Sequence, residues 1–342
     1  MVGDKMNLVT EQAKISHDPH TLFNYYLGAN VLYAYHQIGL FDIVKPNQTV
    51  SVADIAFQTG SEIMRLKALL RVGEVLGYLN HYQDDSIQLS LLGEEMRKHI
   101  GYIIWSVGAY GDMLSRLGDL HTGVQGWSGL RDEGKVALGS DLMNSSILEN
   151  LLSEVLDSFP FQSICDFGCG NGSKLINMLK RYPERKGVGI DISTAAIGLA
   201  RQNVKHHDLS DRVTLLHANI LDMNVSHNDI EVLGEVEVVT SFMMMHDLFN
   251  ITEIRETLFD RLRNVFPKVK YFLISDTLQT PIPYLKEKLP IFNVGFELVH
   301  AYMDVYIPTK EEYDLAFQKA GLTIERCIPF GPTSTYLYVL KV

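Results

Sequence analysis

The stretch from Ile164 to Asp191 constrains the fold of this 342-residue chain more than any other. It reads Ile-Cys-Asp-Phe-Gly-Cys-Gly-Asn-Gly-Ser, then a helix-forming run, and then Gly-Val-Gly-Ile-Asp. The short apolar run before the glycines has the length of a buried strand, and Val188–Ile190 predicts a second strand. The stretch therefore predicts strand, glycine turn, helix and strand in succession, which is one unit of a parallel sheet.

The glycine turn favours an amino-acid group over a phosphate. Gly168, Gly170 and Gly172 alternate with other residues, and glycine permits a positive φ and a close approach of a ligand. The spacing differs from the G-x-G-x-x-G dinucleotide pattern, and no Lys-Ser/Thr pair follows as in a P-loop. Asp166, just before the turn, would repel a pyrophosphate but can accept hydrogen bonds from an ammonium group.

An acid at the end of the second strand suits a ribose, because its oxygens can accept from vicinal hydroxyls. A ligand with a ribose, an amino-acid end and no phosphate is S-adenosylmethionine. We therefore predict that this cofactor binds at Asp166, Gly168, Gly170, Asp191 and Ile192. The alternative is an ordinary α/β turn in which the acids occur by chance.

Two residues after the third predicted strand, at 213–218, extend this cofactor site. Asn219 is expected to accept from the adenine amino group, and Ile220 is expected to pack on the ring. The alternative is that both are loop residues without a ligand contact.

From Leu151 onward, predicted strands and helices alternate as in a parallel sheet with helices on both faces. Strands are expected at 163–167, 187–191, 213–218, 236–242, 271–276, 322–329 and 334–341, with the last two forming an antiparallel hairpin at the sheet edge. The predicted fold class is α/β, a Rossmann-like sheet with an antiparallel last strand, preceded by a mostly helical winged-helix domain. The predicted domains are 1–100, a helical linker and pocket roof at 101–150, and a catalytic domain at 151–342.

The sequence of the first domain predicts two helices followed by a β-hairpin, which is the order of elements in a winged helix. Such a domain can bind DNA or form a dimer. Residues 1–160 contain 11 Lys and Arg against 19 Asp and Glu, a net charge of −8, whereas DNA recognition requires a basic face. We therefore expect no nucleic-acid partner, and a homodimer formed by residues 20–100, where 22–44 is apolar and aromatic.

The composition indicates where in the cell the protein is expected. No apolar run reaches the length of a membrane span, and no signal-peptide pattern is present, so no membrane partner is expected. The three cysteines are too few for a disulfide framework, which favours a cytoplasmic location.

An apolar and aromatic segment at 100–120 precedes a glycine-rich loop at 123–134. Such a segment can roof a small-molecule pocket, so Trp105 and Tyr110 are candidate substrate contacts. Arg131 is a candidate partner for a substrate carboxylate. The alternatives are plain interdomain packing for the aromatics and a solvated loop arginine.

His246 and Asp247 follow the fourth predicted strand, at the edge where open α/β sheets bind ligands. A later predicted helix at 290–304 carries His300 among apolar residues. A lone His on such a helix is usually a core residue, but this one can complete a set of two histidines and one carboxylate. His246 and Asp247 can share a metal only if the chain turns sharply there, as a loop at a strand end permits.

Residues 20–342 resemble the class I methyltransferases of the small-molecule O-methyltransferase type. The glycine turn, Asp191 and the Met-His-Asp after the fourth strand carry the resemblance. It implies a winged-helix dimerisation domain, a Rossmann-like catalytic domain and His246 as general base. The chain departs from the pattern at Leu248, where those enzymes usually have tryptophan.

A narrower resemblance is to the 2-oxo acid C-methyltransferases, which act on phenylpyruvate, 4-methyl-2-oxopentanoate or 5-guanidino-2-oxopentanoate. These enzymes bind iron through a His-Asp pair and a later helical His, and His246, Asp247 and His300 match in type and order. The resemblance implies Fe(2+) and methylation at C3 of a 2-oxo acid in specialised amino-acid or natural-product biosynthesis. A metal-free O-methyltransferase is the alternative, and a non-catalytic binding protein or a ligand-controlled transcription regulator also stays open.

Overall fold

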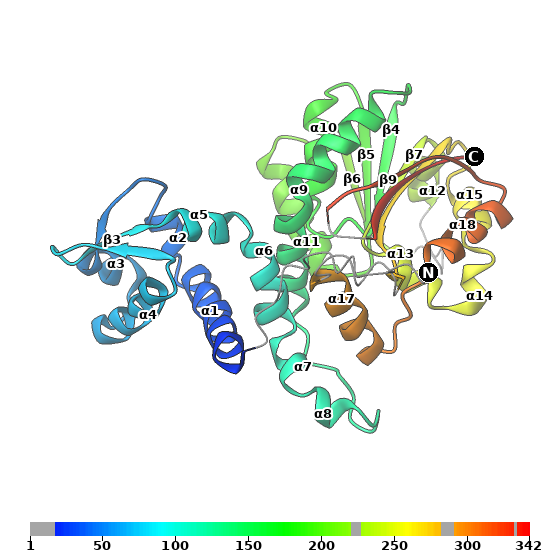
Figure 1. Cartoon of the computed structure of the whole chain (residues 1–342). Coiled ribbons are helices and arrows are strands. Elements are labelled where there is room, and N and C mark those ends of the chain that lie inside the picture. Colours follow the sequence, from blue (N-terminus) through cyan, green and yellow to red (C-terminus); the bar gives the residue numbers. More distant parts are fainter. Residues whose placement is uncertain (1–17, 220–226, 282–290, 332–333) are drawn as a thin grey trace, which may run out of the picture. The chain divides into compact units, whose positions relative to one another are not determined.

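The computed structural model describes residues 18–219, 227–281, 291–331 and 334–342 (Figure 1). The chain divides into two compact units, Met1–Met143 and Asn144–Val342. Across the described ranges, no helix combines the length and the hydropathy that a membrane crossing requires.

The first unit has a small three-stranded antiparallel sheet among helices. The sheet order is β1 (Val50–Ser51), β3 (Ser86–Leu89) and β2 (Leu79–His81). The helices are α1 (Pro19–Gln37), α2 (Leu40–Ile43), α3 (Val52–Thr59), α4 (Ile63–Val75) and α5 (Leu91–Lys98). Helix α3 ends at Gly60 in the left-handed conformation, and α3, α4 and the β2–β3 hairpin follow in the order that the sequence predicts.

The apolar segment after residue 99 folds into short helices. These are α6 (Ile100–Ile103), the π-helix η1 (Ile104–Ala109), α7 (Gly111–Ser115) and α8 (Leu117–Leu120). The long helix α9 (Glu133–Leu156) begins in the first unit and ends in the second.

The second unit is built on a seven-stranded sheet with the order β6-β5-β4-β7-β8-β10-β9. The strands are β4 (Ser163–Phe167), β5 (Lys186–Asp191), β6 (Val213–His217), β7 (Val238–Phe242), β8 (Tyr271–Thr277), β9 (Thr323–Pro329) and β10 (Thr335–Lys341). The first five strands pair in parallel, and β10 pairs antiparallel with both β8 and β9. The predicted Rossmann-like sheet with an antiparallel last strand, β10, is confirmed.

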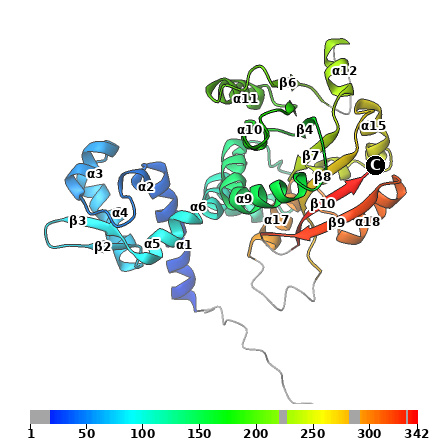
Figure 2. The same cartoon turned by 90° about the horizontal axis from the view of Figure 1, so that it is seen from above.

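Helices cover both faces of this sheet (Figure 2). One face carries α9, α10 (Ser173–Arg181) and α11 (Thr194–His206), and the other carries α12 (His227–Gly234), α15 (Leu258–Val265) and α18 (Lys310–Lys319). Successive strand residues point to opposite faces, so Ile164 and Cys165 belong to separate apolar clusters. The sheet is thereby buried on both sides, and only its strand ends are left to form a ligand site.

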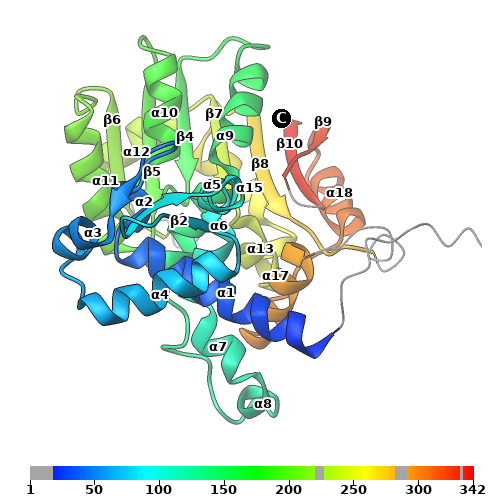
Figure 3. The ribbon, with the colours of Figure 1, turned by 60° about the vertical axis from the view of Figure 1, so that its left-hand side comes forward.

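The carboxyl edge of the sheet carries two further helices (Figure 3). Helix α13 (Met245–Phe249) follows β7 and precedes α14 (Thr252–Arg255), and α17 (Ile291–Tyr302) comes after β8. His246 and Asp247 therefore lie on a short helix and not in the loop that the sequence suggested. The sharp turn occurs earlier, at Met243, which has a positive φ of 55°.

Candidate active site

The glycine turn joins β4 to α10. Gly168 and Gly170 have φ values of 77° and 55°, which residues with a Cβ rarely adopt. A Cβ on Gly168 would lie 3.1 Å from Cε of Met244, whereas a Cβ on Gly170 would meet nothing within 4 Å. The positive φ and the close approach of Met244 both favour glycine at 168, and the turn faces open space at 170. The contact with Met244 also places the turn against the segment that carries His246.

Asp191 ends β5 beside this turn. Its Oδ2 accepts the N–H of Gly170 at 2.8 Å, and its Oδ1 accepts the N–H of Ser193 at 2.8 Å. Because a carboxylate oxygen can accept two hydrogen bonds, each oxygen has capacity for one more donor. Two neighbouring acceptors of this kind suit the vicinal hydroxyls of a ribose.

Asp166 lies on β4 under the turn and is 1% exposed. Its Oδ1 accepts from Oγ1 of Thr240 on β7 at 3.0 Å. Burial raises the pKa of Asp166 to about 6, and the positive charge of Lys174 and the hydrogen bond from Thr240 partly oppose the rise. The carboxylate formed above that pH is poorly solvated, so a nearby cation such as an ammonium group would stabilise it.

The remaining predicted cofactor residues follow β5 and β6. Ile192 is 68% exposed, and its carbonyl accepts from Nε2 of His217 at 2.9 Å. The N–H of Ala218 donates to the Asp191 carbonyl at 3.1 Å, which brings the half-buried Asn219 near the acid. Ile220 lies outside the described residues.

His246 is held by Asp276, an acid at the end of β8 that sequence reasoning missed. Nδ1 of His246 lies 2.8 Å from Oδ1 of Asp276, and its backbone N–H donates to Oδ2 at 2.9 Å. Tyr313 donates its O–H to Oδ2 at 2.6 Å, and the N–H of Thr277 donates to Oδ1 at 2.9 Å. Burial raises the pKa of Tyr313 well above its usual range, so the phenol keeps its proton.

These four donors use the acceptor capacity of the buried Asp276 carboxylate. A carboxylate can only accept, so Nδ1 of His246 carries the proton of the neutral ring. The lone pair of His246 is therefore on Nε2, which is the atom needed by a metal ligand and by a general base alike.

His300 is anchored in a similar way. Its Nδ1 lies 2.7 Å from the Phe296 carbonyl, which again assigns the lone pair of the neutral ring to Nε2. The ring centroids of His246 and His300 are 4.9 Å apart, with the planes nearly perpendicular. The Phe296 ring packs on both histidines, with centroid distances of 5.3 Å to His246 and 4.0 Å to His300.

Asp247 is the third predicted metal ligand. Its Oδ1 lies 3.8 Å from Nε2 of His246, and its side chain is 53% exposed. The structure thus brings His246 close to each of the other two predicted ligands. In the part of the chain that the structure describes, no group of three or more His, Cys, Asp or Glu side chains is arranged to hold a metal ion.

The three candidate substrate residues gather in the first unit. The rings of Trp105 and Tyr110 are 4.6 Å apart between centroids, and the Arg131 guanidinium lies 5.9 Å from the Tyr110 ring. The two aromatic side chains are buried. The sequence placed these residues in two separate segments, and the fold brings them into one cluster.

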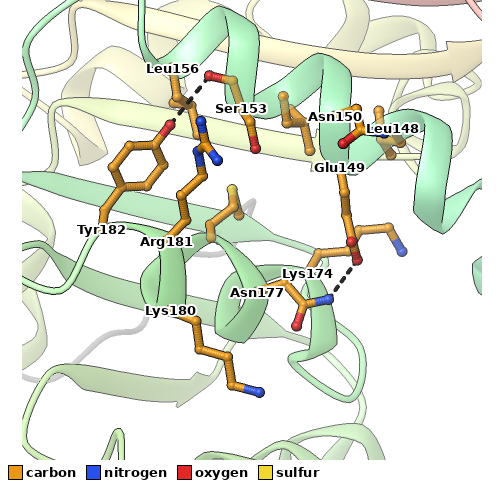
Figure 4. A pocket seen from close by; sticks show the side chains of 12 residues that line it. Leu148, Glu149, Asn150, Ser153, Leu156, Lys174, Asn177, Lys180, Arg181 and Tyr182 are labelled. Atoms are coloured by element: carbon orange, nitrogen blue, oxygen red, sulfur yellow. Dashed lines mark hydrogen bonds between the residues drawn. The ribbon is translucent and has the colours of Figure 1, made fainter.

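A groove of about 480 Å³ lies between α9 and α10 (Figure 4). It is lined by residues of these two helices and Tyr182, and the bond of Asn177 Nδ2 to Glu149 Oε1 spans it at 2.6 Å. None of the predicted site residues lines this groove. The hydrogen-bonded constellation at the carboxyl edge is therefore the better candidate for the chemistry.

Comparison with known proteins indicates the type of enzyme. Residues 161–321 match the family described as methyltransferase domain. The chain is 28% identical over 329 residues to the methyltransferase ungE′ of Aspergillus campestris, with 90% of each chain covered. It is 26% identical over 282 residues to the indolepyruvate C-methyltransferase of Streptomyces griseus, covering 81% of this chain and 79% of the relative.

A solved structure shares the fold. The human N-acetylserotonin methyltransferase in complex with S-adenosylmethionine superposes with a TM-score of 0.64 at 17% identity, covering 96% of this chain and 99% of the other. The domain match and the two methyltransferase relatives, together with the glycine turn and Asp191, show that the chain is an S-adenosylmethionine-dependent methyltransferase.

Proposed function

We propose that this enzyme methylates C3 of a 2-oxo acid and that His246, Asp247 and His300 hold Fe(2+) beside that substrate. The observation that carries the proposal is the pair of histidines, whose rings lie 4.9 Å apart with Nδ1 of each anchored to an acceptor. The relative from Streptomyces griseus, which methylates the carbon of indolepyruvate by its name, supports a 2-oxo acid as substrate.

The three residue types suit iron(II) by their chemistry, although the described structure does not gather them around one point. Two imidazoles and one carboxylate are the ligands of the non-haem iron(II) sites that keep open positions. Metal-binding histidines usually donate their other N–H to a carboxylate or a backbone carbonyl, as His246 and His300 do here. When bound, the ion would act as a Lewis acid and stabilise negative charge on the substrate.

The residues of the chain contribute orientation. The contact of Met244 with Gly168 keeps the His246 segment beside the cofactor turn, and Asp276 keeps the His246 ring in place. In the transfer, C3 loses a proton and bonds to the methyl carbon while the S–CH3 bond breaks, leaving sulfur as a neutral thioether. Holding both reactants in line supplies much of the rate gain.

The candidate substrate residues Trp105, Tyr110 and Arg131 stay part of the proposal. In the cluster of Trp105, Tyr110 and Arg131 the two aromatic side chains are buried, so the half-buried guanidinium group is the part that would meet a substrate. Arg131 would pair with the substrate carboxylate, since arginine binds carboxylates with two hydrogen bonds. The candidate substrates are phenylpyruvate, 4-methyl-2-oxopentanoate and 5-guanidino-2-oxopentanoate.

A second candidate is metal-free methylation of a hydroxyl group with His246 as general base. The bond between His246 and Asp276 favours it, because a base oriented by a buried acid is a common arrangement in catalysis. In this case His300 is a packing residue, and removal of metal has no effect on turnover.

The deciding experiment measures iron and product together. Purified enzyme is analysed for iron and assayed with S-adenosylmethionine labelled with ¹³C at the methyl group, before chelation, after chelation and after return of Fe(2+). The proposal predicts a ¹³C methyl signal on carbon, loss of turnover on chelation and its recovery with iron. His246→Ala, Asp247→Ala and His300→Ala should each lose both iron and turnover, and His206→Ala, on the surface of α11, serves as control.

Full turnover in metal-free enzyme would refute the iron site. A methyl signal on oxygen, together with an active His300→Ala variant, would establish the second candidate.

A further inference from the structure

Most backbone donors of the glycine turn already donate within the protein. The residues whose N–H groups donate to acceptors of the chain are Gly168, Cys169, Gly170, Gly172 and Ser173. Phosphate-binding loops instead point such N–H groups at the ligand. The turn therefore lacks the row of open donors that would bind an anion through the backbone.

The cofactor nevertheless carries an anion. S-adenosylmethionine ends in an amino acid, with an ammonium group and a carboxylate on the same carbon. Asp166 can stabilise the ammonium group, but its negative charge disfavours the carboxylate beside it. A positively charged side chain would therefore stabilise a carboxylate held near this turn.

Lys174, in the first turn of α10, follows the glycine turn directly in the chain. Its Nζ is 5.9 Å from the centroid of Phe242, at the carboxyl end of β7. Its charge acts on Asp166, where it opposes the rise in pKa that burial causes. Lys174 and the Asp166 carboxyl are thus close enough to interact, and both lie where β4 and β7 end.

We propose that Lys174 binds the carboxylate of the methionine part of S-adenosylmethionine. Together with Asp166 it would present a pair of opposite charges to the zwitterionic end of the cofactor. The inference rests on cofactor binding alone, so it holds whichever atom of the acceptor is methylated.

A simpler role for Lys174 is to neutralise Asp166 without touching the cofactor. The two roles differ in which ligands they affect. A lysine that binds the carboxylate matters only for ligands that have one. A lysine that supports Asp166 matters equally for decarboxylated S-adenosylmethionine, which keeps the ammonium group and lacks the carboxylate.

The test compares these ligands on the full-length enzyme by calorimetric titration. Lys174→Met should weaken binding of S-adenosylmethionine and S-adenosylhomocysteine about ten- to a hundredfold, as expected for loss of a charge-assisted bond. Binding of decarboxylated S-adenosylmethionine should change far less, since it is affected only through the charge of Lys174 on Asp166, and Lys174→Arg should restore much of the loss. Lys180→Met is the matched control, because Lys180 lies at the other end of the same helix (Figure 4) and is exposed.

Two results would overturn the proposal. One is an equal loss of affinity for the carboxylated and the decarboxylated ligand, and the other is no loss for either. A measurement on the unaltered enzyme guards against a variant that does not fold. The unaltered enzyme should bind S-adenosylmethionine at least about tenfold more tightly than the decarboxylated compound at low salt. This difference in affinity should shrink as ionic strength rises. Equal affinity for both ligands would refute the role of Lys174.

Discussion

Nδ1 of His246 lies 2.8 Å from Oδ1 of Asp276, in a bond that joins the helix after β7 to the end of β8. Because Asp276 also accepts from Tyr313, the acid is fixed from a third element, α18. The resulting network sets which nitrogen of His246 carries the proton. Both candidate chemistries need the lone pair on Nε2, so Asp276 matters for either.

Asp276→Asn should therefore lower kcat about 10- to 100-fold, as is typical when the partner of a functional histidine is lost. An amide offers one acceptor oxygen, so it cannot satisfy all four donors that now meet the carboxylate. The KM for S-adenosylmethionine should stay near that of the unaltered enzyme, because Asp276 is not among the cofactor residues. Steady-state kinetics with thermal denaturation as a folding control would measure the effect.

Tyr313→Phe is the milder companion variant, since it removes one of the four donors and keeps the ring. Its kcat should fall by less than that of Asp276→Asn. If a folded Asp276→Asn enzyme kept full kcat, the role assigned to this network would be wrong.

Asp191→Ala should weaken binding of S-adenosylhomocysteine about ten- to a hundredfold, because the ribose hydroxyls lose their acceptor. The variant also removes the bonds to the N–H groups of Gly170 and Ser193, so the ribose contribution needs a separate measure. The 2′-deoxy analogue of the ligand provides it. It should bind the unaltered enzyme more weakly than the ribose form, and Asp191→Ala should abolish this difference. A difference that survives the substitution would remove Asp191 from the ribose site.

The sequence predicted those parts of the site that are encoded locally. The glycine turn and Asp191 lie within one strand-turn-helix-strand unit, where spacing alone indicates which residues come together. The strands of the sheet followed from short apolar runs. His246 was found because it directly follows a predicted strand, and His300 because it can complete a set of two histidines and one carboxylate, which a known family also has.

Asp276 and Tyr313 were missed because their partners are distant in the chain. An acid near the end of the apolar strand β8 is itself a signal, since a buried carboxylate must find donors. The sequence cannot indicate which donors these are, because His246 and Tyr313 come from other elements. The loop expected at His246 was wrong for a related reason, since the single residue Met243 makes the turn and allows a helix to start at once.

Exposed apolar side chains on helix α1 lead us to predict that the protein is a homodimer. Four large residues in its first half, Leu22, Phe23, Tyr25 and Tyr26, are 62–70% exposed, and a cluster of exposed apolar side chains usually marks an interface. The double variant Phe23→Glu, Tyr26→Glu should shift light-scattering mass toward the monomer. Val124→Glu, at a site that is 86% exposed in a loop of the same unit, should leave the mass unchanged. A monomeric, fully active parent enzyme would contradict the prediction.

Asp166 should make stability and cofactor affinity respond to pH in opposite directions. Its pKa is raised from 3.8 to about 6, chiefly by burial. Between these values the folded protein holds a proton that the unfolded chain has lost, so this residue makes the protein less stable as pH rises through the window. Cofactor binding needs the ionised form to meet the ammonium group, so affinity should rise as pH passes about 6.

Asp166→Asn separates the two effects, because the amide oxygen can still accept from Thr240 while the charge is lost. The variant should be more thermally stable than the parent above pH 6 without ligand, and it should bind S-adenosylhomocysteine more weakly there. Its affinity should also lose the dependence on pH around 6. Calorimetric titrations at several pH values from 5 to 8 would measure the affinity. Thermal denaturation of the ligand-free proteins at the same pH values would measure the stability. A parent enzyme whose affinity is constant across this range would show that Asp166 does not bind the ammonium group as a carboxylate.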